Sequence, residues 1–158
     1  MSEITEEQFI NAKTCGEELY KTFKGVYCPY FQEEVVFNAK GLEHLKFKQK
    51  NQARIVEDQY IRLKILKFAP EVLKQTRTIQ GISEQKVFEL QRSNHRNHHI
   101  LVDAMYYEFV AIITQVRVRV IVKQIGTGPK YFWSIIPFWS TDRNLGERKL
   151  HYGSPEHD

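Results

Sequence analysis

The chain lacks the features that mark a secreted or membrane-spanning protein. It has two cysteines, Cys15 and Cys28, too few for a disulfide framework and without metal-type spacing. Its longest uncharged apolar run, Phe109–Val116, is too short to cross a bilayer. The first residues are acidic and lack the basic and apolar parts of a signal peptide. These absences predict a cytoplasmic protein with no membrane partner.

Familiar catalytic signatures are missing too. The sequence contains no P-loop, dinucleotide-binding fingerprint, Gly-x-Ser-x-Gly or HExxH motif. The stretch Arg92–His99 holds His95, His98 and His99, but no Asp, Glu or Cys lies within it to complete a metal site. We therefore expect an exposed polar hairpin tip there, and we predict neither a metal nor a cofactor.

The composition is that of a globular domain with an uneven charge. The 158 residues are 42% hydrophobic and 13% aromatic, which favours one packed domain over residues 1–141 and a polar tail over residues 142–158, either frayed or used for a partner. The net charge is +4. Residues 1–39 carry seven acids and three lysines (−4), whereas residues 40–67 carry eight cations and three acids (+5). Such a lopsided field attracts an anion to one side of a molecule.

Helical patterns come first along the chain and strand patterns follow. A capping box at Thr5–Gln8 opens a helix that Gly25 ends, Asn38 caps a short helix, and Ala53–Phe68 is helical until Pro70, with Glu71–Gln75 as a further turn. Strands are predicted at Arg77–Gln80, Lys86–Gln91 and Ala104–Thr114, and as a hairpin over Val116–Trp139. This order predicts an α+β fold, with N-terminal helices packed on one face of a roughly four-stranded antiparallel sheet.

The hairpin Val116–Trp139 carries two different faces. Valines alternate with Arg117, Arg119 and Lys123, so the valines face a core and the cations face the other side. After the turn Gly126–Pro129, the segment Tyr131–Ser134 returns beside the cations. The cations form either a phosphate-binding surface or an ion-pair ladder with Glu89 and Glu108. The first alternative makes RNA the leading ligand hypothesis.

Three further positions have both a functional and a structural interpretation. His44, followed by Lys46 and Lys48, is an acid/base candidate or an ordinary surface histidine. Arg62 on the next helix, near Arg54, binds a phosphate or pairs with Asp58 four residues earlier. Ser134, expected to face away from Trp133, binds a phosphate oxygen or satisfies a local hydrogen bond, and Trp133 itself is a core residue or stacks on a base.

Two of these stretches resemble one family. VVFNAKGLEHL resembles the strand–turn–Gly-x-x-His segment of phage-associated nucleases in the barnase–EndoU–colicin–RelE superfamily. KYFWSIIP resembles their last strand, in which an aromatic precedes a Ser or Thr three residues before a proline. The resemblance spans Tyr27 to Trp139. Besides these short motifs, the predicted order of elements, helices followed by a four-stranded antiparallel sheet, is also that of the superfamily.

The resemblance implies a RelE/barnase-like fold and metal-independent RNA cleavage, in which a 2′-hydroxyl attacks the adjacent phosphate and leaves a cyclic phosphate. It implies that His44 is the acid or base and that Ser134 positions the phosphate. Arg62 and Arg117 would stabilise the pentavalent charge, and the residues expected to bind RNA are Lys46, Lys48, Arg54, Arg119, Lys123 and Trp133. Many relatives have a second histidine or basic pair shortly after the first, and here Lys46 and Lys48 stand in that place.

Three hypotheses follow. The first is a ribonuclease, acting as a toxin or effector and restrained by an acidic inhibitor protein. The second is an RNA-binding module without catalysis, and the third is a protein-interaction domain that uses the aromatic segment Tyr131–Trp139. The first requires that His44, Ser134 and the sheet cations converge on one concave surface.

Overall fold

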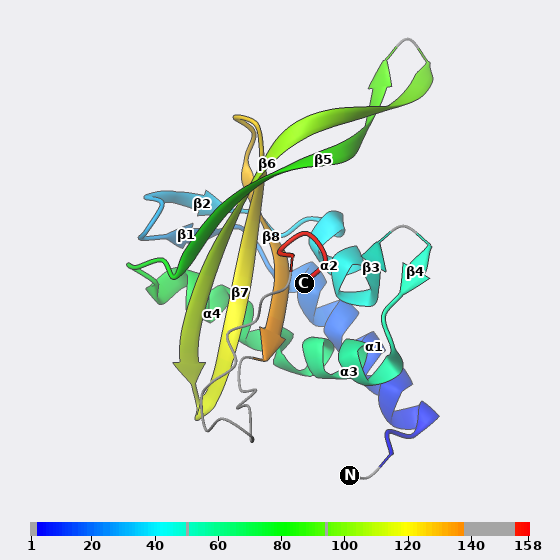
Figure 1. Cartoon of the computed structure of the whole chain (residues 1–158). Coiled ribbons are helices and arrows are strands. Elements are labelled where there is room, and N and C mark those ends of the chain that lie inside the picture. The colour runs from blue at the N-terminus through cyan, green and yellow to red at the C-terminus, as the bar shows by residue number, and fades with distance from the viewer. Residues whose placement is uncertain (1–2, 50, 94, 138–153) are drawn as a thin grey trace, which may run out of the picture.

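The computed structural model describes residues 3–49, 51–93, 95–137 and 154–158 and has an α+β architecture (Figure 1). Its elements in chain order are α1 (Glu6–Thr22), β1 (Val26–Cys28), β2 (Glu33–Val35), α2 (Ala39–Lys46), β3 (Phe47–Gln49), β4 (Gln52–Ala53), α3 (Val56–Ile65), the 3-10 turn η1 (Leu66–Phe68), α4 (Ala69–Gln75), β5 (Gly81–Ser93), β6 (Arg96–Ile113), β7 (Val116–Ile125) and β8 (Lys130–Pro137). Strands β5 to β8 form one antiparallel sheet in sequence order. The predicted α+β class with a four-stranded antiparallel sheet is therefore confirmed.

The valine face of β7 forms the centre of the main core. Val118, Val120 and Val122 are completely buried and pack with residues of α2, η1 and α4, among them Leu45 and Leu66. Helix α1 joins this core through Tyr20, and the hairpin β1–β2 joins it through Val26, Cys28 and Val35. The opposite face of β7 carries the cations, as the alternation predicts.

Helices α1 and α2 begin at their predicted starts because the expected caps form. Thr5 and Gln8 make the capping box of α1, and the Asn38 side chain accepts a hydrogen bond from the Gly41 N–H at 3.3 Å. Helix α1 ends at Thr22, before the predicted stop at Gly25. Helix α3 starts at Val56 instead of Ala53, because Gln52–Ala53 pair with β3. Pro70 lies in the first turn of α4, where a missing N–H costs little.

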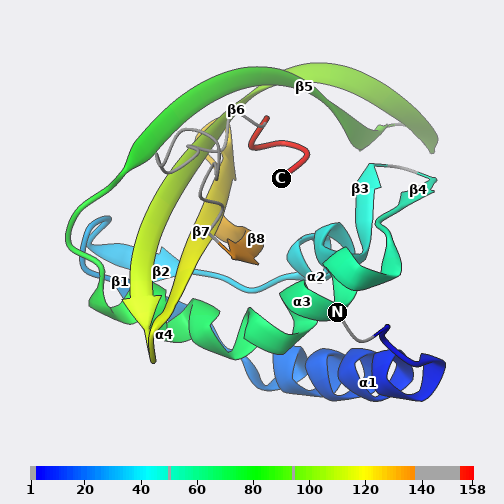
Figure 2. The same ribbon diagram turned by 60° about the horizontal axis from the view of Figure 1, so that its bottom comes forward.

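The strand bounds differ from prediction at the start of the sheet. Residues 77–80 are not a strand, and β5 runs without a break from Gly81 to Ser93. Strand β6 pairs with β5 from Arg96 to Glu108 and with β7 from Ala104 to Ile113. The remaining part of β5 and β6 makes a two-stranded arm that curves over α2 and β3 (Figure 2).

The histidine-rich stretch forms the tip of this arm. Ser93 pairs with Arg96, and His98 and His99 belong to β6, so the connection is shorter than the predicted loop. Among the described residues no three His, Cys, Asp or Glu side chains gather as a metal ion would need. In the same part of the chain, no helix is both long enough and apolar enough to cross a membrane.

The packing of α2 on β8 depends on Gly41. A Cβ atom at this position would lie 2.4 Å from the main-chain oxygen of Phe132. Gly41→Ala should therefore lower the free energy of unfolding by about 1–3 kcal/mol, because the helix must move off the strand. Urea denaturation measures this. Glu43→Ala, on the exposed side of the same helix, should stay within about 0.5 kcal/mol of wild type, and equal losses in both variants would contradict the close packing.

Candidate anion-binding site

Five polar side chains converge beside the face of β7 that is opposite its valines, and we call them the cation cleft: Arg54, Arg62, Arg119, Lys123 and Ser134. Arg119 and Lys123 come from β7, Ser134 from β8 and Arg62 from α3, and Arg54 lies just before α3. None is more than 8% exposed. Four cations buried this deeply require compensating anions.

One residue receives hydrogen bonds from most of the cleft. The main-chain oxygen of Asp158 accepts from Ser134 Oγ at 3.0 Å, from Arg54 Nη2 at 3.3 Å and from Arg62 Nη1. The Asp158 carboxylate lies 2.6 Å from Arg119 Nη2. Donors from four separate parts of the chain thus point at the oxygens of a single residue. This convergence is the geometry of an oxyanion-binding site.

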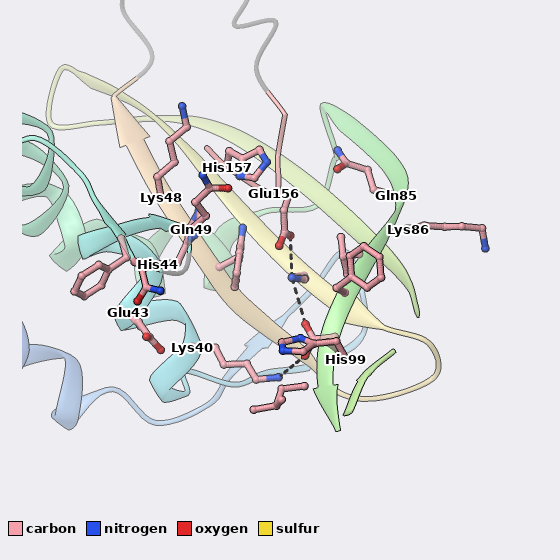
Figure 3. A pocket seen from close by; sticks show the side chains of 18 residues that line it. Lys40, Glu43, His44, Lys48, Gln49, Gln85, Lys86, His99, Glu156 and His157 are labelled. Carbon is pink, nitrogen blue, oxygen red and sulfur yellow. Dashed lines mark hydrogen bonds and ion pairs between the residues drawn. The ribbon is translucent and has the colours of Figure 1, made fainter. Parts of the chain in front are cut away.

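Lys123 forms a second anion contact in the cleft. Its Nζ lies 2.8 Å from the Glu156 carboxylate and 3.7 Å from that of Glu89. Trp133 Nε1 donates to the Pro155 carbonyl oxygen at 3.1 Å, and Ser154 Oγ lies 3.2 Å from Gln85 on β5. Residues Ser154–Asp158, the acidic segment from here on, therefore lie across the cleft beneath the curved arm (Figure 2). The dashed lines in Figure 3 follow these contacts from Glu156 through Lys123 and Glu89 to Lys40.

His44 joins the cleft from α2. Its ring stacks on the Trp133 ring, with centroids 4.0 Å apart and an interplanar angle of 18°. Arg54 Nε donates to the His44 carbonyl oxygen at 2.9 Å, and Arg54 Nη2 lies 3.0 Å from His44 Nε2. Because a guanidinium only donates, this contact requires a neutral imidazole whose Nε2 accepts. Burial, followed by the charges of Arg54, Arg62 and Lys123, lowers the pKa of His44 to about 2.

A β-bulge turns both Trp133 and Ser134 toward the cleft. Ser134 pairs with Ile121 and Phe132 pairs with Val122, so Trp133 is an extra residue in β8. Two consecutive side chains consequently share one face of the strand. The prediction that Ser134 faces away from Trp133 is wrong, because it assumed an unbroken alternation.

The structural ion pairs considered from the sequence also form. Asp58 lies 2.8 Å from Arg62 Nε, and Glu108 lies 2.8 Å from Arg119 Nη2. Each of these arginines therefore holds one acid of the helix or sheet and still donates to Asp158. A structural ion pair and an anion-binding role can therefore coexist in one arginine, because a guanidinium has five N–H donors.

The structure does not bring every predicted residue into the cleft. Lys46 pairs with Glu17 of α1 at 2.9 Å. Arg117 shares the β7 face of Arg119 but makes no ion pair with the described residues. Lys48 lines a neighbouring cavity instead. His44, Arg54, Arg62, Arg119, Lys123, Trp133 and Ser134 do come together.

That cavity has a volume of about 880 Å³ and lies between α2, β3 and the arm (Figure 3). Lys123, Trp133 and Glu156 line it, so it is continuous with the cleft. Phe88 and Leu90 of β5 also line it and are 72% and 58% exposed. An exposed aromatic beside buried cations suits a ligand with both flat rings and negative charge.

Sequence reasoning missed the acidic segment. The available signal was a pair of acids, Glu156 and Asp158, in a tail considered only as frayed or as a partner-binding element. Phe138, Trp139 and the tail up to residue 153 lie outside the described residues. In comparisons with protein-family models, with curated proteins and with solved structures, no match to this chain was found.

The environment of His44 predicts a pH dependence of stability. Since the pKa is about 2 when folded and about 6.5 when unfolded, the unfolded chain binds more protons between these values. The contribution of His44 to stability should therefore fall as the pH drops below about 6.5, by at most about 1.4 kcal/mol per unit. Urea denaturation from pH 8 to pH 4 measures this loss. His44→Gln should show a smaller loss, and an unchanged slope would contradict a neutral buried His44.

Proposed function

We propose that the chain is a metal-independent ribonuclease whose cation cleft binds the scissile phosphodiester of RNA. The observation that carries the proposal is that Arg54, Arg62, Arg119 and Ser134 donate to the oxygens of one residue, Asp158. A phosphodiester presents the same combination of negative charge and clustered acceptors. RNA supplies the 2′-hydroxyl that allows cleavage without a metal ion.

In the proposed reaction the guanidinium groups and the Ser134 hydroxyl hold the non-bridging oxygens, where charge develops in the transition state. The 2′-oxygen bonds to phosphorus, the bond to the 5′-oxygen breaks, and a cyclic phosphate remains. Neutral His44 accepts the hydroxyl proton once Arg54 Nη2 moves from Nε2 to the phosphate. Burial lowers the pKa of Lys123 to about 8, so at neutral pH it holds a proton that it can give to the departing oxygen.

Membership of the barnase–EndoU–colicin–RelE superfamily belongs to the same proposal. It is supported by the order of helices and strands and by the positions of His44 and Ser134 at one cleft. A cytoplasmic toxin or effector of this kind would require an acidic inhibitor protein. Such a partner would present carboxylates to the cleft, as Glu156 and Asp158 of the acidic segment do.

A second candidate function is RNA binding without cleavage. It is favoured by the state of His44, whose Nε2 is engaged by Arg54 and whose pKa of about 2 makes it a weak base. The two functions differ in products: the enzyme leaves fragments with cyclic phosphate ends in EDTA, whereas the binder leaves RNA intact and loses affinity steeply with salt.

Arg62 offers a direct test of cleavage. Incubation with total RNA in EDTA should yield fragments with 2′,3′-cyclic phosphate ends, and Arg62→Gln should slow their formation by about 10²–10³-fold, because a buried donor to the phosphate is lost. Lys64→Gln removes the same charge from the exposed side of α3 and should leave the rate within about twofold of wild type. Arg62→Lys keeps the charge and should recover part of the rate. If folded wild-type protein leaves the RNA intact, the ribonuclease proposal is refuted.

The cavity predicts a role for Phe88 in RNA affinity. Phe88→Ala should weaken binding of single-stranded RNA by about 1–3 kcal/mol, because a base loses its stacking partner. Fluorescence anisotropy with a labelled oligonucleotide measures the change. Ile112→Ala changes a similarly exposed apolar residue (64%, against 72% for Phe88) that does not line the cavity, and should have no effect. If wild type, Phe88→Ala and Ile112→Ala bind the oligonucleotide equally well, the RNA bases do not stack on Phe88.

A further inference from the structure

We infer that the acidic segment Ser154–Asp158 is an intramolecular competitor of the anionic ligand: it occupies the cation cleft and must leave before a phosphate enters. Which ligand it competes with rests on the proposed function, but the competition itself rests on the contacts of the segment. They place its two acids, Glu156 and Asp158, on Lys123 and Arg119.

The segment meets the cleft through the groups that an oxyanion would use. Asp158 takes the donors of three arginines and of Ser134, and these would otherwise bind a phosphate. Pro155 accepts from the Trp133 indole, and Glu156 faces the cavity beside the cleft. A bound phosphodiester and Asp158 therefore cannot use these donors simultaneously.

The segment satisfies the cleft incompletely. Arg119 Nε and the hydroxyls of Tyr106 and Tyr131 are buried on this face without a hydrogen-bond partner among the described residues. His157 Nδ1, in the segment itself, also lacks one within that part of the chain. Each unpaired buried group costs about 1–3 kcal/mol. A ligand with more acceptor oxygens can use these donors, so it can displace the segment.

The carboxylates that belong to the sheet and helix persist when the segment leaves. Asp58 still pairs with Arg62, Glu108 with Arg119 and Glu89 with Lys123. The four cations of the cleft are thus accompanied by three fixed acids, and the segment adds two more. Removal of the segment exposes a site with net positive charge and preformed geometry, which favours anion binding.

The test uses inorganic pyrophosphate and the indole N–H signal of Trp133 in ¹H–¹⁵N NMR spectra, assigned in a Trp139→Phe background. The double variant Glu156→Gln/Asp158→Asn should shift this signal, because Pro155 moves away from the indole. It should also bind pyrophosphate at least about tenfold more tightly, the gain expected if the cleft is free in a tenth or less of wild-type molecules.

Glu108→Gln is the matched control. It removes from Arg119 a carboxylate at 2.8 Å, close to the 2.6 Å of Asp158, but leaves the segment intact. It should keep the indole signal in place and gain less affinity. Added peptide Ser-Pro-Glu-His-Asp should return the signal of the double variant toward wild type, and pyrophosphate added to wild type should shift it away.

The outcomes separate the two proposals. If the double variant gains no more affinity than Glu108→Gln, or if pyrophosphate binds to wild type without moving the indole signal, the competition is refuted. If pyrophosphate displaces the segment but no variant binds or cleaves RNA, the competition stands and the ribonuclease proposal fails.

Discussion

The burial of positive charge is the constraint on which the rest of this structure depends. Removing an ion from water costs several kcal/mol even after relaxation, so guanidinium and ammonium groups stay buried only where carboxylates accompany them. The valine face of β7 holds Arg119 and Lys123 in place from behind, because those valines lie in the main core. Glu108 and Glu89 then accompany them on the sheet. Core packing and charge pairing therefore act on opposite faces of the same strand.

Local sequence signals predicted most of the elements. Alternation in β7 predicted the two faces, and cap residues such as Asn38 predicted helix starts. The meeting of His44, Ser134 and Arg62 followed from the resemblance and is seen in the structure. The bulge at Trp133 was not predictable, because one extra residue in an apolar strand leaves no periodic trace. The acidic segment was missed for a related reason: its contacts are distant in sequence, and five polar residues have no pattern.

His44 shows why a residue type does not determine its chemistry. An isolated imidazole titrates near neutrality, which made His44 an acid/base candidate in the sequence. In the cleft it lies against Trp133 and accepts from Arg54, and burial together with neighbouring cations keeps it neutral. The property that decides its role belongs to four other residues: Trp133 on β8, Arg62 on α3, Lys123 on β7 and Arg54 just before α3. Only folded geometry shows that combination.

The long arm of β5 and β6 has a consequence for how such a protein can diverge. Beyond Ala104 toward the tip, β6 pairs with β5 alone, so the arm has no third strand to keep in register. Residues added in matched pairs, one on each strand, would lengthen it and preserve the inward and outward pattern of side chains. The reach over the cavity can thus change by small steps while the cation cleft and the core stay as they are. Relatives would then differ first in the length of ligand that fits beneath the arm, and only later in the side chains of the cleft.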